Sequence, residues 1–195
     1  YESKVFPDID KIIPLVRGSD NHNILEYQLK FNCWIKADLT FEGLKQVIIQ
    51  PKERVYIGDI PPRLKQIENK PNQFIDTIKI EKVPNPKHKK EKWFDSTNTI
   101  PLNSGMVAII GGKGSGKSAL SDIIGHFCYC KTMDKASFLN DNRFRKTPKK
   151  YAEDYQGYIL WKNGQKDKSI NLLQKEYPSS IERAQYLPQK YIQDD

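Results

Sequence analysis

Apolar and polar residues alternate along the chain in short runs, separated by the Gly, Pro, Asn and Asp residues that favour turns. Apolar runs of this length predict strands. The predicted strands cover residues 11–16, 30–36, 55–57, 74–83, 106–110, 157–161, 169–173 and 184–187. A helical pattern covers residues 40–50, and a second helix is expected from Lys117 toward Phe127. This order predicts an α/β fold with a mixed sheet around the 106–110 strand and antiparallel strands beside it.

Local signals mark where some of these elements begin or end. Thr40 stands at the start of its predicted helix, where the hydroxyl can accept a hydrogen bond from an amide of the first turn. Asn163 and Gly164 form a strong hairpin signal between two predicted strands. The consecutive prolines Pro61 and Pro62 are expected to break the chain.

A glycine-rich loop follows the predicted strand at 106–110. Residues 111–118 (GGKGSGKS) match the complete P-loop pattern, G-x-x-x-x-G-K-[ST]. Glycines let successive backbone amides point at one anion, and the helix that follows adds the positive end of its dipole. Lys117 is expected to meet the β and γ phosphates, and Ser118 to coordinate magnesium. The residues expected to contact ATP are Gly112, Lys113, Gly114, Ser115, Gly116, Lys117, Ser118 and Ala119.

A P-loop alone does not separate a kinase, a GTPase and an ABC-type ATPase. The Asn-Lys-x-Asp string that reads guanine in GTPases is absent from the sequence. Residues 186–189 (YLPQ) lie at the end of a predicted strand and resemble the Q-loop of ABC-type ATPases. That resemblance implies that Gln189 reaches the magnesium ion and the attacking water. Lys117 and Gln189 are therefore the candidate catalytic residues, and Ser118 and Gln189 the candidate magnesium ligands.

The chain carries a formal net charge of +8, and the excess is clustered. One basic cluster lies within residues 143–150 and contains no acid, and a second lies within residues 87–92. Such clusters favour an anionic partner such as nucleic acid, although a solvated loop is the alternative. The candidate nucleic-acid contacts are Arg143, Arg145, Lys149 and Lys150.

Cysteine count and hydropathy argue against a disulfide-stabilised protein and against a transmembrane protein. Three cysteines are too few for a disulfide scaffold, so a reducing cytoplasm is the expected compartment. Cys128 and Cys130 lie close to His126, but the spacing is not that of a usual zinc site, and small buried residues on a helix are the alternative. No run of about 18 apolar residues exists, so neither a transmembrane helix nor a membrane partner is expected.

The upstream half of the chain carries a family resemblance. Residues 34–45 (WIKADLTFEGLK), followed by Pro51 and by Arg54-Val55, come after the string GSDNH at residues 18–22. With SFLN at residues 137–140 and the Arg-Phe-Arg that follows, they resemble TrlF-like ATPases. These proteins join a PHP (polymerase and histidinol phosphatase) domain to an ATPase of the ABC/SMC type.

The resemblance implies a domain organisation, cofactors and partners. Residues 1–62 would be the end of a PHP-like domain and a connector, and residues 63–195 the N-terminal lobe of an ABC/SMC-like ATPase. Asp20 and His22 match the last two metal ligands of PHP domains, which suit zinc or manganese. The cofactors of the ATPase would be ATP and magnesium, and its site would be completed in a homodimer or higher oligomer. Relatives of this kind act on DNA, in genome maintenance or phage defence.

Other motifs of a complete ABC-type enzyme are absent from the sequence. It has no signature motif, no apolar run ending in Asp-Glu, no switch His and no His-x-His of a PHP centre. Both ends look cut, so a fragment is expected that binds ATP without hydrolysing it at a useful rate. Two alternatives remain open: a P-loop kinase or other phosphotransferase, and a nucleic-acid-binding module regulated by nucleotide.

Overall fold

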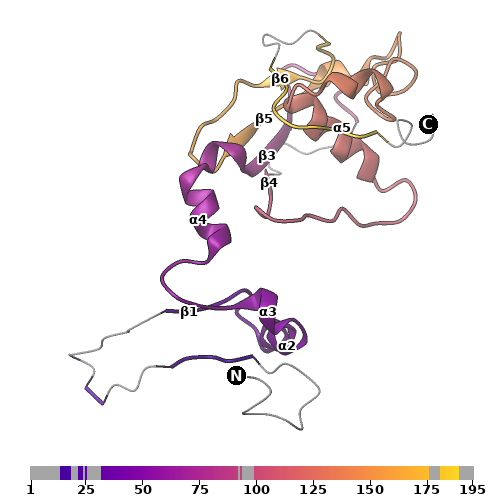
Figure 1. Ribbon diagram of the computed structural model, residues 1–195. Helices are drawn as coiled ribbons and strands as arrows, with labels where there is room; N and C mark the ends of the chain where they lie inside the picture. Colours follow the sequence, from indigo (N-terminus) through magenta and orange to yellow (C-terminus); the bar gives the residue numbers. More distant parts are fainter. Residues whose placement is uncertain are drawn as a thin grey trace. The chain divides into compact units, whose positions relative to one another are not determined.

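The chain folds into two compact units, Tyr1–Asn69 and Lys70–Asp195, in the computed structural model of Figure 1. The structure describes residues 14–18, 22–23, 25, 32–91, 93, 99–175 and 181–188. The division falls after α4, whereas the boundary expected from the sequence, between residues 62 and 63, falls at the first turn of that helix. Each unit is α/β, with antiparallel strand pairs.

The first unit contains two short paired strands, and the chain that connects them forms two helices. Its elements are β1 (Cys33–Ile35), α2 (Phe41–Ile49), α3 (Pro51–Arg54), β2 (Val55–Ile57) and α4 (Pro62–Asn69). β1 pairs with β2, and Trp34 lies opposite Tyr56. The Thr40 hydroxyl accepts a hydrogen bond from the Gly43 amide at 3.0 Å, so the predicted cap of α2 is confirmed.

Two predictions in this unit are wrong. Residues 14–16 form no strand, and Leu15 and Val16 are exposed, because the described strands offer this segment no partner; residues 11–13 lie outside the description. Pro62 does not break the chain but begins α4. The first helical position tolerates proline, because its missing N–H would have no partner within the helix.

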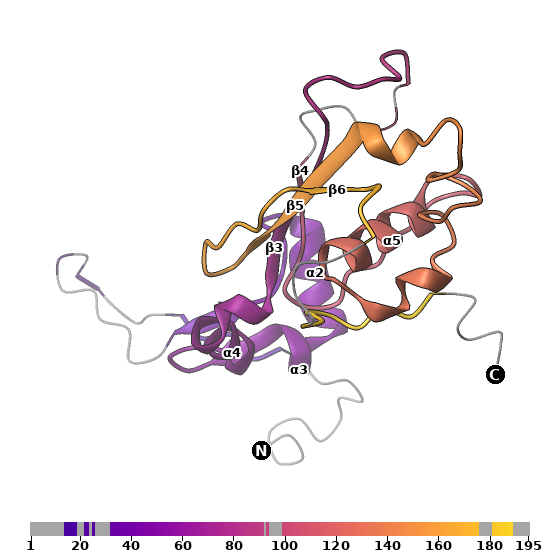
Figure 2. The ribbon, with the colours of Figure 1, turned by 90° about the horizontal axis from the view of Figure 1, so that it is seen from above.

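The second unit contains a four-stranded antiparallel sheet with the order β4-β3-β5-β6. Its elements are η2 (Pro71–Gln73), β3 (Ile75–Lys82), β4 (Thr99–Pro101), α5 (Lys117–Phe127), η3 (Lys131–Lys135), η4 (Tyr151–Asp154), β5 (Tyr155–Trp161) and β6 (Ile170–Asn171). α5 packs against the sheet, as Figure 2 shows. Gly157 makes this contact possible, because a Cβ there would lie 2.6 Å from the Phe127 ring.

The core of the second unit lies between α5 and the sheet. Ile78 and Ile80 of β3 and Ile159 of β5 are fully buried, and they pack in one cluster with Ile123 and Phe127 of α5. Alternate residues of β5 are buried, as expected for a strand with one face on a core. This packing fixes α5, and therefore the loop that precedes it, against the sheet.

The Asn-Gly turn is confirmed as the connection that follows β5. Gly164 adopts a φ of +80°, which glycine permits without strain, and its amide donates to the Trp161 carbonyl at 2.9 Å. The return strand is shorter than predicted, because within residues 169–173 only Ile170 and Asn171 pair with β5.

Two predicted strands of the second unit are wrong. Residues 106–110 are not a strand in this structure: Met106 is 95% and Ile110 89% exposed, and no described strand lies beside them. Residues 184–187 also run as an irregular segment. A run of apolar residues forms a strand only where a neighbour completes its backbone hydrogen bonds. The sheet described is consequently antiparallel throughout, not mixed around the 106–110 segment.

Candidate nucleotide-binding site

The P-loop leads directly into α5, as the sequence predicts. Gly116 caps the helix with a φ of +90°, and Gly114 has a φ of +84°. Both angles lie in the left-handed region that glycine adopts readily, so both glycines are needed for this path. Residues 111–115 are exposed, which leaves their backbone accessible to an anion. The dipole of an eleven-residue helix points its positive end at this loop.

The side chain of Lys117 folds back onto the glycine loop that precedes it. Its Nζ donates hydrogen bonds to the carbonyl oxygens of Gly111 at 2.8 Å and Gly112 at 2.7 Å. The ammonium group is therefore held against the backbone of the glycine loop. Ser118 is exposed at the first turn of α5, and Ala119 beside it is 4% exposed and belongs to the core.

Asp122 anchors α5 to two segments that are distant in the sequence. Its side chain is fully buried and accepts hydrogen bonds from the amides of Phe138 at 2.7 Å and Leu139 at 3.0 Å. It also accepts one from the hydroxyl of Tyr186. Burial, together with this bond to a carboxylate, raises the pKa of Tyr186 above its ordinary value. Asp122 is thus a structural acceptor, a role that sequence spacing did not reveal.

The segment that leads to Gln189 is fixed to the P-loop helix. Besides the bond to Asp122, Tyr186 accepts a hydrogen bond from Thr132 through its carbonyl at 2.5 Å. The amide of Arg183 donates to the Cys128 carbonyl at 2.9 Å, just beyond α5. Gln189 itself lies outside the described residues, three positions after Tyr186. The described contacts therefore tie the chain before Gln189 to the helix that carries Lys117 and Ser118.

The four candidate nucleic-acid contacts differ in how exposed they are. Arg143 and Lys149 are exposed and Lys150 is half-buried, whereas Arg145 is only 7% exposed. The Arg145 guanidinium donates to the carbonyls of Leu172 at 2.8 Å and Gln174 at 3.0 Å. The expectation that Arg145 contacts phosphate is therefore wrong, because its donors hold the 172–174 segment instead.

The structure gives different information on the two groups of candidate metal ligands. Asp20 lies outside them, and His22, which is exposed, belongs to no described group with metal-ligand geometry. Cys128 and Cys130 are buried, and burial raises the pKa of their thiols to about 12 and about 11. The Cys130 thiol donates to the Ala184 carbonyl at 2.8 Å. These protonated, buried thiols fit the alternative of small core residues.

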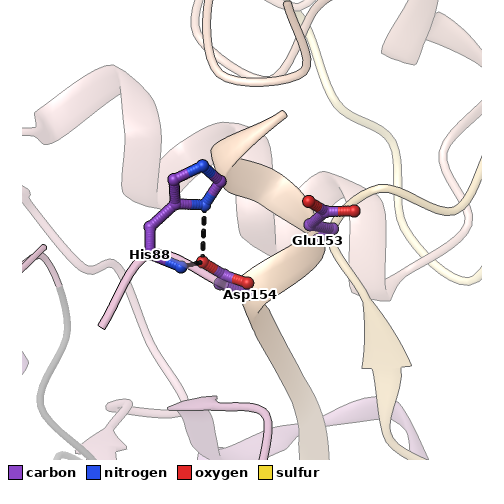
Figure 3. Close-up of side chains that lie close together, drawn as sticks. All are labelled: His88, Glu153 and Asp154. Atoms are coloured by element: carbon purple, nitrogen blue, oxygen red, sulfur yellow. Dashed lines mark hydrogen bonds and ion pairs between the residues drawn. The ribbon is translucent and has the colours of Figure 1, made fainter. Parts of the chain in front are cut away.

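Sequence reasoning missed a group formed by His88, Glu153 and Asp154, whose ligand-type atoms all lie within 4.8 Å of one another (Figure 3). Asp154 is 2% exposed and accepts hydrogen bonds from the amides of Lys87 and His88 and from His88 Nδ1, each at 2.7 Å. Although burial opposes its charge, these bonds hold the pKa of Asp154 below its ordinary value. No spacing rule links residues so far apart in the sequence.

Comparisons with protein-family models, with curated proteins and with solved structures found no match for this chain. None of the helices in the described residues combines the length and the apolar character that crossing a bilayer requires.

Proposed function

We propose that this chain binds the phosphates of ATP, with magnesium, through residues 111–118. The observation that carries the proposal is the position of Lys117, whose ammonium group bridges two carbonyls of a glycine loop at the start of α5. An incoming β or γ phosphate would take that ammonium as its counter-charge and the loop amides as donors. Ser118, exposed on the first turn, would offer its hydroxyl to magnesium.

We further propose that the chain is the ATP-binding part of an ATPase of the ABC/SMC type joined to a PHP-like domain. The order of the motifs supports this proposal, and so does the attachment of the 181–188 segment to α5. Through that attachment Gln189 would respond to the γ phosphate at the end of the helix that carries Lys117. In the complete protein, a second copy would close the site.

The test is a titration of a fluorescent ATP analogue with magnesium against the parent chain and Lys117→Ala. The variant removes one charge that meets the phosphates, so affinity should fall at least tenfold, the value of one charge-assisted hydrogen bond of about 1.4 kcal/mol or more. Lys131→Ala is the matched control, because it removes an exposed lysine just beyond α5. Equal affinity of parent and Lys117→Ala would refute the proposal.

A further inference from the structure

Two basic segments that are far apart in the sequence lie side by side at the start of β5. The loop at residues 84–90 is attached to η4 by Asp154, which accepts hydrogen bonds from the backbone amides of Lys87 and His88. Figure 3 shows the contact between His88 and Asp154. Lys150 immediately precedes η4, and its carbonyl accepts a hydrogen bond from the amide of Glu153. The 84–90 loop and Lys150 are therefore both attached to η4, which brings parts of the two basic clusters together.

We name this surface the basic rim. It consists of Lys87, Lys89, Lys90, Lys146, Lys149 and Lys150. All except the half-buried Lys150 are exposed. We include Lys146 because it is exposed and its carbonyl accepts a hydrogen bond from the Lys150 amide at 2.8 Å, which keeps the two backbones close together.

The acids nearest the basic rim neutralise only part of its charge. Asp154 is almost completely buried and is occupied by His88 and by two amides. Glu153 is 19% exposed and pairs with Lys87, whose own side chain remains 72% exposed. Glu91, at the end of the loop, is the exposed carboxylate closest in sequence. The rim therefore presents a field that attracts an extended anion.

Aromatic rings lie at the centre of the rim. The His88 ring meets the Tyr151 ring edge to face, with centroids 4.7 Å apart. Lys149 Nζ lies 5.6 Å from the centroid of the same Tyr151 ring, and both rings are partly exposed. Asp154 accepts from His88 Nδ1, which fixes the orientation of that ring. Proteins that bind single-stranded nucleic acid combine cations with exposed aromatic rings. The cations bind the phosphates, and a base stacks on the ring.

We propose that the basic rim binds single-stranded nucleic acid, with successive phosphates on lysines of both segments and one base stacked on Tyr151. This inference is independent of the proposed ATP site, since it uses no residue of the P-loop. It replaces the contact set expected from the sequence, because Arg145 is buried and the 84–90 loop takes its place.

The test uses fluorescence anisotropy of a labelled oligodeoxythymidine with the whole chain at several salt concentrations. Lys89→Gln/Lys90→Gln and Lys146→Gln/Lys149→Gln should each weaken binding and reduce the slope of log affinity against log salt by roughly 0.7 per lost contact. Lys131→Gln/Lys168→Gln, a pair of exposed lysines outside the rim, should bind as the parent does. If only one of the two rim pairs affects binding, the shared surface is refuted.

Tyr151 tests the stacking itself. Tyr151→Phe keeps the ring and should bind as the parent does, whereas Tyr151→Leu should bind about tenfold more weakly, which corresponds to one lost base stack. Equal binding of Tyr151→Leu, or equal affinity for an oligomer and for inorganic polyphosphate of the same charge, would refute the proposal. A circular-dichroism spectrum and a urea-unfolding midpoint equal to those of the parent show that the variants are folded, and Lys117→Ala should leave oligonucleotide binding unchanged.

Discussion

At the scale of single residues, His126 shows how burial decides a side chain's chemistry. It is fully buried in α5, its Nε2 lies 3.1 Å from the Asn171 carbonyl, and its Nδ1 lies 3.4 Å from Arg145 Nη2. Because a carbonyl only accepts and a guanidinium only donates, the ring carries its proton on Nε2 and stays neutral. Burial, reinforced by the charge of Arg145, lowers its pKa to about 4.

This neutral histidine predicts a pH dependence of stability. In the unfolded chain the ring binds a proton near its ordinary pKa of about 6.5. As the pH falls from that value toward the folded pKa of about 4, the unfolded state gains protons first. The free energy of unfolding should therefore decline by up to about 1.4 kcal/mol per pH unit in this window and stay level above it.

Urea unfolding of the parent and of His126→Gln between pH 4.5 and 7.5 measures this effect. Glutamine keeps a donor and an acceptor but does not titrate, so the variant should show a flatter profile even if it is less stable throughout. The carboxylates that lose stability at low pH are common to both proteins and cancel in the difference. Parallel profiles would rule out His126 as the titrating group.

At the scale of elements, the link between α5 and the 181–188 segment gives a second stability prediction. Tyr186→Phe removes the hydroxyl that Asp122 accepts from, while Asp122 keeps its two amide donors. The free energy of unfolding should fall by about 1.5 to 3 kcal/mol, the range for one bond to a charged acceptor. Urea unfolding measures it, with Tyr158→Phe on β5 as the control of equal chemistry. A loss of equal size in both variants would contradict this assignment.

Elements with signals inside their own sequence could be predicted, and those that depend on a distant partner could not. The Thr40 cap, the turn at Asn163-Gly164 and the start of α5 after the glycine loop all use neighbouring residues, and all three are confirmed. The apolar run at 106–110 has the composition of a strand, but a strand also needs a neighbour, which composition does not contain.

The residues of the candidate sites also differ in whether neighbouring sequence or distant contacts determine their place. The P-loop is a continuous motif, so its residues and the helix after it could be located from the sequence. By contrast, the burial of Arg145 and the role of Asp122 follow from contacts across the fold. The junction of the 84–90 loop with η4 depends on Asp154, which stands 66 positions after His88. No local pattern contains that information.

At the scale of the whole molecule, we predict that this chain does not hydrolyse ATP rapidly. Hydrolysis requires a group that positions the attacking water. Asp122, on the helix after the P-loop, is fully buried and accepts three hydrogen bonds, and Asp141 pairs with Lys175. Phosphate release by the purified chain should therefore stay below about 1 s⁻¹. Faster release that Lys117→Ala abolishes would show that the chain is a complete enzyme.

The different surroundings of the cysteines have a practical consequence. Cys128 and Cys130 keep their protons at neutral pH, while Cys33 on β1 is partly accessible. Thiolates, not thiols, attack maleimides, so a dye should attach selectively to Cys33 in the first unit. A fluorescent nucleotide would occupy the second unit. A dye on Cys33 and a fluorescent nucleotide at the proposed site would form an energy-transfer pair, so the colour of the emitted light would report whether the nucleotide binds.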